Sequence, residues 1–562
     1  MADKKMMIVD GISVEIENER NLLEVIRKVG IELPTFCYSS ELSIYGACRM
    51  CMVENERGGL EAACSTIPRA GMNIKTNTVR LQKYRKNILE LLLANHCSDC
   101  TTCDKSTKCR LQELAKRFQI KDVRFPNTAV HQIDDSSACI TRDAGKCILC
   151  GDCVRMCNET QNVGAIDFTY RSSKVAVNTA FSKPIGLTNC VGCGQCAAVC
   201  PTGAIVVKNE TEKLWKAIED PNLKVVVQIA PAVRVAIGKD LLMKDGDDVM
   251  GKIVAALRRI GVDEVFDTSF SADLTVIEET NEFIDRLQNG GKLPLITSCC
   301  PGWIQYAENT HPELMENISS CKSPMQMFAA IIKDQARQKG ENIFHVAIMP
   351  CTAKKFEAQR DEFKHEDIPD VDLVITTKEL IKMIRKSGII FEELEPEAID
   401  MPFGTISGAG VIFGVTGGVT EAVLRRVADT NSRADYFAIE KMGQRGMVGI
   451  KEFDIPYGDT VLHIGVASGL KNAEAIIQKV KDGEKFDFIE IMACPNGCIN
   501  GGGQPRSHKP PRIARTNGLY KSDKMLSIRR AQANPIVDKV YKEYIQGRNH
   551  ELLHVHYTRV KH

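Results

Sequence analysis

The sequence lacks an excess of either charge, an export signal and any apolar run of membrane length. Lys and Arg number 73 against 72 Asp and Glu, a formal charge of +1, which argues against nucleic acid as the main partner. The opening residues, MADKKMMIVDGISVEIE, contain no apolar segment of a secretory signal. No stretch approaches the roughly 20 apolar residues that span a membrane. We therefore expect a cytoplasmic protein that neither crosses a membrane nor binds nucleic acid.

Cysteines are also absent from a long central part of the chain, since none lies between Cys200 and Cys299. Of the 23 cysteines, 17 precede residue 201, in a chain whose 562 residues correspond to about four domains. The composition, 44% hydrophobic and 26% charged, is that of a folded globular protein. Without export, disulfides are improbable and metal becomes the default explanation for the cysteines. The first third is therefore predicted to be a series of small metal modules, followed by a domain with its own core.

The first module begins with two short predicted strands, MMIVDG and ISVEIE, and an amphipathic helix over residues 22–29, a pattern that resembles a β-grasp ferredoxin. Four cysteines follow in a C-x10-C-x2-C-x12-C pattern: Cys37, Cys48, Cys51 and Cys64. Four thiolates from one loop-rich module suit a [2Fe–2S] cluster. Zinc held by the same thiolates is the alternative, since ligand softness does not separate zinc from iron.

The second module follows a helix-like run over residues 81–96 and carries an H-x3-C-x2-C-x5-C pattern. Its predicted ligands are His96, Cys100, Cys103 and Cys109, which form a complete set for a [4Fe–4S] cluster or, taken alone, for zinc. A neutral imidazole in place of a thiolate makes the site less negative and should raise the cluster's potential. Cys97 is off the spacing and is interpreted as a bystander.

The third module repeats one pattern, C-x2-C-x2-C-x3-C, and the second copy ends in Cys200-Pro201. In two-cluster ferredoxins the fourth cysteine of each run binds the other cluster. The predicted ligands are Cys147, Cys150, Cys153 and Cys200 for one [4Fe–4S] cluster, and Cys157, Cys190, Cys193 and Cys196 for the second. Structural zinc knuckles would not explain the repeat. Four clusters in series indicate a path for single electrons towards a site later in the chain.

From about residue 213 the pattern predicts buried parallel strands that alternate with amphipathic helices, which is α/β construction. The predicted strands are KVVVQIAP, PLITS, HVAIMP, VDLVITT, DTVLHIGVAS and FDFIEIMA. Three of them run into cysteines, at the carboxyl ends where open α/β sheets bind ligands. Pro301 and Thr352 are predicted as the first residue and the N-cap of the following helices, whose amides would face an anionic cluster. Glycines near Gly501 are predicted to let the backbone approach a bulky ligand.

Three loops carry a resemblance to one family. TSCCPGW at 297–303, MPCTAKK at 349–355 and EIMACPNGCINGGGQP at 490–505 resemble the signature loops of the [FeFe]-hydrogenases. The front modules, in this order, resemble the large clostridial monomeric form. The resemblance implies a β-grasp [2Fe–2S] module over 1–80, a small helical module with one histidine and three cysteine ligands over 81–125, and a two-[4Fe–4S] module over 126–209. Residues 210–562 would form a two-lobed α/β catalytic domain with mostly parallel sheets.

The resemblance implies that Cys300, Cys351, Cys494 and Cys498 bind a further [4Fe–4S] cluster. Cys498 would also bridge to a two-iron unit carrying CO, cyanide and an azadithiolate, and the whole is the H-cluster. The implied activity is reversible formation of H2 from protons, with ferredoxin or flavodoxin as electron carrier. Dedicated maturation proteins would supply the two-iron unit.

Proton transfer is assigned by the same resemblance to Cys299, whose thiol can exchange protons near neutral pH. The family's route would continue through Glu279, Ser319 and Glu282 to Arg286 at the surface. Glu279, Glu282 and Arg286 share one stripe of a helix, at i, i+3 and i+7. The same spacing also fits a solvated helix face with a Glu282–Arg286 ion pair worth about 0.3 kcal/mol.

The pocket of the two-iron unit is also implied by resemblance. Its predicted lining is Ala230, Pro231, Ser323, Pro324, Met349, Met492 and Phe413. Lys354 would pair with a cyanide nitrogen. From the residues alone, Ser323-Pro324 is a good helix start and the methionines could be plain core. Ala232 stands where the relatives usually have serine and Met325 where they usually have glutamine, and each removes a hydrogen-bond donor from the pocket.

Two other functions fit parts of the sequence. One is the H2-activating subunit of an NAD-linked, electron-bifurcating complex, which often carries an extra cluster module after the catalytic loops. No cysteine follows Cys498, which favours a self-sufficient enzyme. The other is a non-catalytic H2 sensor or an iron–sulfur assembly relative. Cys321 is interpreted as a small core residue, and His554 and His556 as part of a terminal strand.

Overall fold

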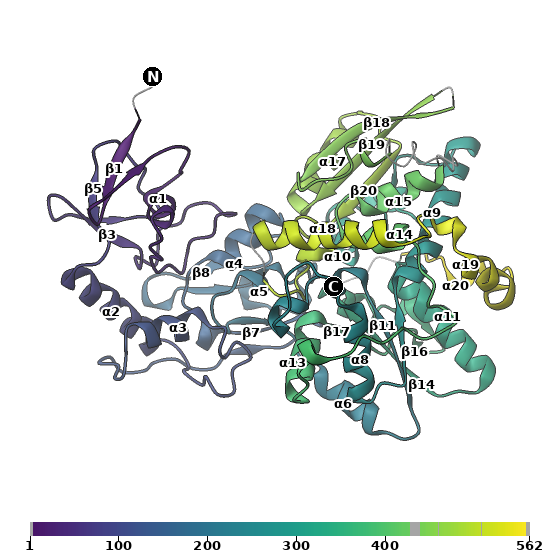
Figure 1. Cartoon of the computed structure of the whole chain (residues 1–562), viewed down its shortest axis with the longest axis horizontal. Helices are drawn as coiled ribbons and strands as arrows, with labels where there is room; N and C mark the ends of the chain where they lie inside the picture. The colour runs from purple at the N-terminus through teal and green to yellow at the C-terminus, as the bar shows by residue number, and fades with distance from the viewer. Residues whose placement is uncertain (1–3, 428–438, 459, 507–508, 558–562) are drawn as a thin grey trace.

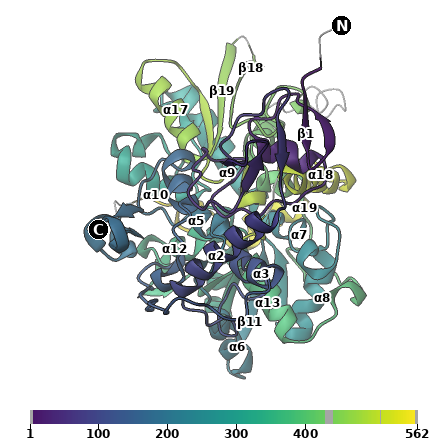
Figure 2. The ribbon, with the colours of Figure 1, turned by 90° about the vertical axis from the view of Figure 1, so that its left-hand side faces the viewer.

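The computed structural model describes residues 4–427, 439–458, 460–506 and 509–557 (Figure 1). The N-terminal modules lie at one end of the molecule and the large domain at the other. The turned view in Figure 2 looks along this axis, with the first module and helices α2 and α3 in front. Among the described helices, none combines the length and apolar character needed to cross a membrane.

The first module is a five-stranded mixed sheet, in the order β2-β1-β5-β3-β4, with one helix. Its elements are β1 (Met6–Val9), β2 (Ile12–Glu15), α1 (Leu22–Lys28), β3 (Met52–Asn55), β4 (Leu60–Ala62) and β5 (Asn73–Lys75). Asp10 and Gly11 both have positive φ, as the two-residue turn between antiparallel strands requires. Asn21 caps α1 by accepting a hydrogen bond from Glu24 N at 3.1 Å.

Two helices, α2 (Val79–Ala94) and α3 (Arg110–Arg117), form the second module. Thr78 caps α2, and Leu89 of α2 packs with Leu111 and Leu114 of α3 in one buried cluster. The third module has two small sheets and two short helices. Its elements are β6 (Ile133–Asp134), β7 (Ile140–Asp143), α4 (Asp152–Arg155), β8 (Asp167–Thr169), β9 (Ala176–Asn178), α5 (Gln195–Val199) and β10 (Ile205–Val207).

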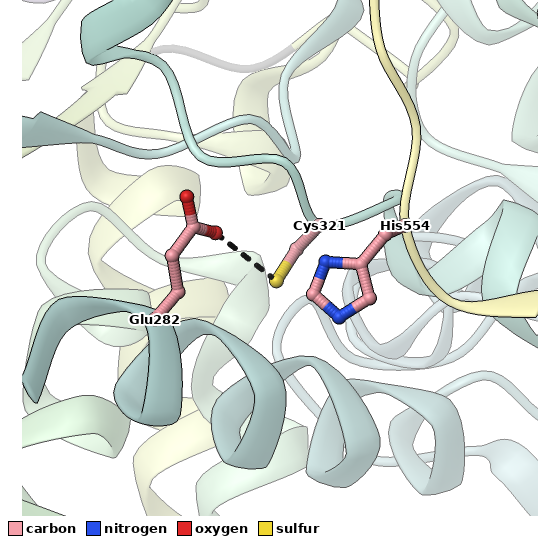
Figure 3. Close-up of side chains that lie close together, drawn as sticks. All are labelled: Glu282, Cys321 and His554. Atoms are coloured by element: carbon pink, nitrogen blue, oxygen red, sulfur yellow. Dashed lines mark hydrogen bonds between the residues drawn. The ribbon is translucent and has the colours of Figure 1, made fainter. Parts of the chain in front are cut away.

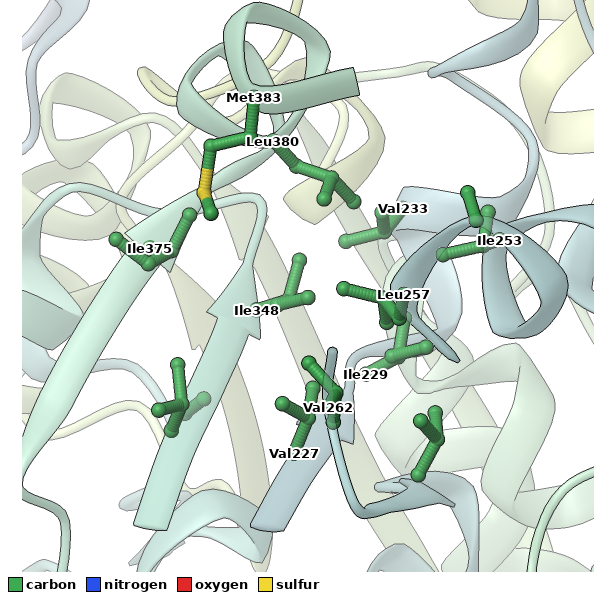
Figure 4. Packing of buried hydrophobic residues seen from close by; sticks show 14 of the residues in the cluster. Val227, Ile229, Val233, Ile253, Leu257, Val262, Ile348, Ile375, Leu380 and Met383 are labelled. Atoms are coloured by element: carbon green, nitrogen blue, oxygen red, sulfur yellow. The ribbon is translucent and has the colours of Figure 1, made fainter. Parts of the chain in front are cut away.

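In its described residues the large domain contains two four-stranded sheets and a small two-stranded one, β15 (Lys364–His365) with β16 (Ile368–Pro369). The first is entirely parallel, in the order β12-β11-β14-β17. Its strands are β11 (Lys224–Ile229), β12 (Glu264–Asp267), β14 (Ile343–Met349) and β17 (Leu373–Thr376). One face is covered by a core that includes Val227, Ile229 and Ile348 from the strands and Leu257 and Leu380 from helices (Figure 4). Burial of these side chains stabilises the sheet by about 2 kcal/mol each.

The second sheet has the order β13-β20-β19-β18. Its strands are β13 (Leu295–Ile296), β18 (Ile450–Tyr457), β19 (Thr460–Ser468) and β20 (Phe488–Met492). β13, β20 and β19 are parallel, whereas the edge strand β18 is antiparallel to β19. Neither β18 nor β12 was among the strands predicted from the sequence.

The large domain has many helices, several of which pack on the two four-stranded sheets. They are α6 (Thr211–Glu219), α7 (Pro231–Arg234), α8 (Met250–Ile260), α9 (Ser269–Asn289), α10 (Pro301–Thr310), α11 (Pro324–Lys339), α12 (Ala353–Glu357), α13 (Thr377–Lys386), α14 (Gly408–Val411), α15 (Gly418–Val427), α17 (Leu470–Lys481), α18 (Lys509–Met525), α19 (Pro535–Val540) and α20 (Asn549–Leu552). The long helix α18 runs across the domain beside α14 (Figure 1). The predicted fold class, ferredoxin-like modules followed by a two-lobed α/β domain with mostly parallel sheets, is confirmed.

Candidate active site and cluster-binding loops

Cysteine loops follow the carboxyl ends of strands from both sheets of the large domain. Cys299 and Cys300 follow β13, Cys351 follows β14, and Cys494 and Cys498 follow β20. Cys300 is the N-cap of α10 with Pro301 at its first position, as predicted, and Ala493 N donates to Cys300 Sγ at 3.3 Å. The site therefore lies where the two sheets meet.

The four predicted H-cluster thiols are buried together. Burial raises the pKa of Cys300, Cys351, Cys494 and Cys498. The negative charge of Cys351 and Cys300 would raise the pKa of Cys498 and of Cys494 further. Thiols that resist ionisation because they are buried, and close to one another, suit a shared cation, which compensates several thiolates at once. These residues therefore fit the iron–sulfur group that the family resemblance assigns to them.

Thr352 and the glycines after Cys498 make close contacts with the backbone that the sequence did not predict. Thr352 is at the N-cap position of α12, but its hydroxyl donates to Gly192 O at 2.6 Å and does not cap the helix. A Cβ on Gly502 would lie 2.3 Å from Cys193 O, and one on Gly501 would lie 2.2 Å from Pro350 O. These glycines thus allow the loop to press against protein backbone, including the cysteine loop of the third module.

The third module forms a cavity of about 30 Å³ that is lined by cysteines from both repeats. The cysteines in its lining are Cys147, Cys150, Cys153 and Cys200, the set expected from exchange of the fourth ligand. The thiol of Cys196 interacts with those of Cys190 and Cys157, three of the four residues of the second predicted set. Cys193, the fourth, interacts with Cys196 and with Cys494 of the large domain.

The second module brings its four predicted ligands around a small cavity. The lining includes His96, Cys100, Cys103 and Cys109. Both ring nitrogens of His96 are buried without a hydrogen-bond partner in the described part of the chain. Burial and Lys146 lower the pKa of His96 and keep the imidazole neutral, the form that binds metal. An orphaned imidazole beside three thiols fits a metal centre.

In the first module the four predicted ligands also meet. Cys48 N donates to Cys37 Sγ at 3.3 Å, and Phe36 N donates to Cys48 Sγ at 3.5 Å. Hydrogen bonds from the Cys48 and Cys64 thiols lower the pKa of Cys37, and the Cys51 thiol is in turn hydrogen-bonded to that of Cys64. The four sulfur atoms thus form one connected group.

The predicted proton route is gathered beside the cysteine loops. Burial raises the pKa of Cys299, and burial together with the charge of Glu282 raises the pKa of Glu279 to about 8. Ser319 Oγ donates to Glu282 Oε2 at 2.9 Å, and Arg286 Nη2 lies 2.6 Å from Glu282 Oε1. Glu279 is 0% exposed, and the Glu282 and Arg286 side chains are only 14% and 15% exposed. A solvated helix face is therefore excluded.

Most of the predicted pocket residues start helices or end strands, and Phe413 lies in a short 3-10 helix, Ile412–Gly414. Pro231 and Pro324 occupy the first positions of α7 and α11, and Ser323 accepts the capping hydrogen bond of α11. The remaining members, Ala230, Met349, Met492 and Phe413, are all buried. The ammonium group of Lys354 lies 2.6 Å from Glu357 Oε2 and 3.3 Å from Cys299 O, partners that the sequence did not predict.

The surroundings of Glu282 were not predicted from the sequence. Ser320 N donates to Glu282 Oε2 at 3.0 Å, and Cys321 Sγ lies 3.8 Å from the same oxygen. His554 reaches this place from the C-terminal segment (Figure 3). It pairs with Cys321 as a single β-bridge rather than in a terminal strand, and Cys321 is buried in the core as predicted. No spacing signal links residues so far apart.

Comparison with known families covers most of the chain. Residues 223–502 match the "Iron only hydrogenase large subunit, C-terminal domain", and residues 510–560 match the "Iron hydrogenase small subunit". The "2Fe-2S iron-sulfur cluster binding domain" matches residues 6–79, and the "4Fe-4S dicluster domain" matches residues 146–204. Residues 85–124 match the "NADH-ubiquinone oxidoreductase-G iron-sulfur binding region".

Individual relatives extend over the same length. The "NADP-reducing hydrogenase subunit HndD" of Solidesulfovibrio fructosivorans is 42% identical, over 98% of both chains. "Iron hydrogenase 1" of Clostridium pasteurianum is 36% identical, over 99% of this chain and 100% of its own. The solved [FeFe]-hydrogenase HydA1 from Chlamydomonas reinhardtii is 38% identical, with a TM-score of 0.56, over 63% of this chain and 99% of its own. The chain therefore belongs to the [FeFe]-hydrogenase family, in its clostridial type, and is an iron–sulfur oxidoreductase that acts on H2.

Proposed function

We propose that the chain catalyses the reversible reaction 2 H⁺ + 2 reduced ferredoxin = H2 + 2 oxidised ferredoxin. The observation that carries the proposal is the group of four buried thiols, Cys300, Cys351, Cys494 and Cys498, beside the loop of Cys193. Flavodoxin is the other carrier of the same class. The division at residues 80, 125 and 209, the cytoplasmic location and the need for maturation proteins are parts of the proposal.

The cluster assignments give each set of ligands one role. Cys37, Cys48, Cys51 and Cys64 would hold one [2Fe–2S] cluster. The other accessory sets are His96 with Cys100, Cys103 and Cys109, then Cys147, Cys150, Cys153 and Cys200, and finally Cys157, Cys190, Cys193 and Cys196, each for one [4Fe–4S] cluster. The tight contact of Gly502 with the Cys193 loop supports electron transfer from the last set to the catalytic cysteines. When bound, the H-cluster would supply the metal at which H2 is formed and split.

The protein's own groups would move the protons. With a pKa near 8, Glu279 carries a proton at neutral pH and can donate it to Cys299. Ser319 and Glu282 would restore that proton: the Ser319 oxygen, 2.9 Å from Glu282 Oε2, would accept a proton from Glu282 and pass its own to Glu279. Lys354 would hold negative charge in the pocket, and Met349, Met492 and Phe413 would keep water out.

A second candidate function follows from the 42% identity to the NADP-reducing subunit. The chain would then activate H2 within a complex and pass its electrons through a partner subunit to NADP. The family match of residues 85–124 to a region of NADH-ubiquinone oxidoreductase is compatible with such a partner.

A single preparation of the protein tests both candidate functions. The chain is expressed with maturation proteins and purified under exclusion of oxygen, and infrared spectra are recorded for CO and cyanide bands. We expect those bands, H2 evolution from reduced ferredoxin by the isolated chain, and none from NADPH. Evolution from NADPH only after a flavin subunit co-purifies would favour the second candidate. Zinc in the clusters, or absence of the bands, would refute both.

The Cys299→Ser variant tests the proton assignment separately. Serine is nearly the same size, but its hydroxyl gives up a proton far less readily than a thiol does. Unlike the Ser319 hydroxyl, which only passes a proton between two carboxyl groups, the last group of the route must itself release one, so proton transfer should slow. We expect loss of most H2 evolution with iron content and infrared bands retained. A variant as active as the wild type would remove Cys299 from the route.

A further inference from the structure

Glu282 lies where three parts of the chain meet: helix α9, the loop over residues 318–323 and the C-terminal segment (Figure 3). It has the Arg286 guanidinium on one side. On the other side of Glu282 lies the Ser320 hydroxyl, which is also hydrogen-bonded to His554. The two sides differ in their ability to exchange a proton with water.

The Arg286 side holds Glu282 in place but cannot exchange a proton. Its guanidinium donates to Glu282 and to the carbonyl oxygens of Lys292, Glu316, Asn317 and Ile318, at 3.1 to 3.2 Å for the four carbonyls. A guanidinium stays protonated in proteins and has no acceptor atom. Arg286 therefore fixes the position and charge of Glu282, and another group must deliver protons to that carboxylate.

The Ser320 side provides such a group. Ser320 Oγ lies 3.1 Å from Glu282 Oε2 and 2.8 Å from His554 Nδ1. A hydroxyl can accept a proton on one side while it donates its own on the other. An imidazole changes its charge near neutral pH more readily than any other side chain. The contact joins residues 234 positions apart, so it exists only because the C-terminal segment packs against this loop.

The far side of the His554 ring faces a carboxylate. Nε2 lies 2.9 Å from Glu278 Oε2. Burial would raise the pKa of Glu278, but hydrogen bonds from His554 and Tyr541 outweigh it and lower that pKa, so the carboxylate is charged. The ring of the exposed residue His550 lies beside the His554 ring, with 4.9 Å between the two ring centroids. His554 is 10% exposed, which gives it an edge towards water.

We propose that His554 exchanges protons between solvent and Glu282 through the Ser320 hydroxyl. This role rests on the proposed function. It adds a point at which protons enter from solvent, which the route predicted from the sequence does not contain. In the direction of H2 formation, the Nδ1–H bond of the imidazolium breaks as Ser320 Oγ takes that proton. The Ser320 O–H proton passes at the same time to Glu282 Oε2. Neutral imidazole remains, water returns a proton to it, and no electron moves.

Two substitutions at His554 separate this role from a structural one. In His554→Asn the side-chain amide can keep the hydrogen bond to Ser320, but it cannot carry a proton. We expect its H2 evolution to fall about tenfold, while the CO and cyanide infrared bands stay unchanged. In His554→Ala, added imidazole should restore most of the lost rate. His556→Asn, at an exposed histidine two residues later, is the matched control and should evolve H2 at the wild-type rate.

A double variant tests the path through the hydroxyl. If Ser320 and His554 act in one relay, Ser320→Ala combined with His554→Asn should lose no more rate than either single variant. The inference fails if His554→Asn evolves H2 at the wild-type rate, or if the two losses multiply. A wild-type protein with no diatomic bands and no H2 evolution would instead overturn the proposed function, and this inference with it.

Discussion

Replacing Asp523 by asparagine should loosen the C-terminal helix α18 from the large domain. The Asp523 carboxylate is 0% exposed and accepts hydrogen bonds from Arg425 at 2.8 and 2.9 Å and from Arg529 at the same distances. Burial would raise the pKa of Asp523, but the two guanidinium groups outweigh it and lower that pKa. The substitution would leave both cations facing a neutral amide, and α18 packs directly on the segment that carries Phe413.

The magnitude follows from the partners that remain. Breaking a buried ion pair costs about 3 to 5 kcal/mol, and Glu421 at 2.6 Å from Arg425 still compensates part of the charge. We therefore expect the lower end, about 3 kcal/mol, which lowers the unfolding midpoint of a domain of roughly 350 residues by about 4 °C. The stabilisation exists above the unfolded-state pKa near 4 and is lost as pH falls through the lower folded-state pKa.

Calorimetry of the loaded protein at pH 7 measures this shift. Asp538→Asn, on the exposed face of α19, is the control and should change the midpoint by less than about 2 °C. A midpoint for Asp523→Asn equal to that of the control would show that the buried network contributes nothing to the attachment of α18.

Three further predictions concern the clusters and the proton route. Glu279→Gln should lose most H2 evolution, since the amide cannot release a proton. In the wild type the stabilising contribution of Glu279 should be full below pH about 4 and be lost as pH rises through about 8, so unfolding midpoints recorded from pH 6 to 9 should fall more steeply than in the glutamine variant. His96→Cys should lower the potential of one [4Fe–4S] cluster, measured by redox titration with electron paramagnetic resonance, because a thiolate replaces a neutral ligand. Gly502→Ala should slow electron transfer from ferredoxin more than from a small dye, because its Cβ would lie 2.3 Å from Cys193 O; equal slowing with both donors would contradict the inferred path.

Local patterns made much of the fold predictable. The turn at Asp10-Gly11 and the alternating residues around it define the first hairpin, and continuous apolar runs define the buried parallel strands. β12 was missed because EVFD is short and half polar, and β18 because an edge strand with Pro456 lacks the apolar run of its neighbours. β12 depends on a partner distant in sequence, since Glu264 pairs with Val226 of β11, whereas β18 forms a hairpin with β19, the next strand along the chain.

In the candidate site, too, local patterns were predictable and contacts between distant residues were not. Cysteine spacing and family resemblance named residues that the structure brings together, including the orphaned imidazole of His96. The spacing could not show that the Thr352 hydroxyl turns to Gly192, because the two residues are 160 positions apart. Nor could it assign His554, whose partners Ser320 and Glu278 belong to a different part of the chain.

The sharing of ligands between the two sheets has a mechanical consequence. Cys351 follows a strand of one half of the large domain, and Cys300 and Cys494 follow strands of the other. A metal centre held by all three cysteines would link the two halves of the domain. Inserting it should therefore raise the free energy of unfolding of the whole domain. Protein isolated without its metal centre should be cut faster by proteases in the loops between the two halves. Loading with the metal centre should slow this cleavage.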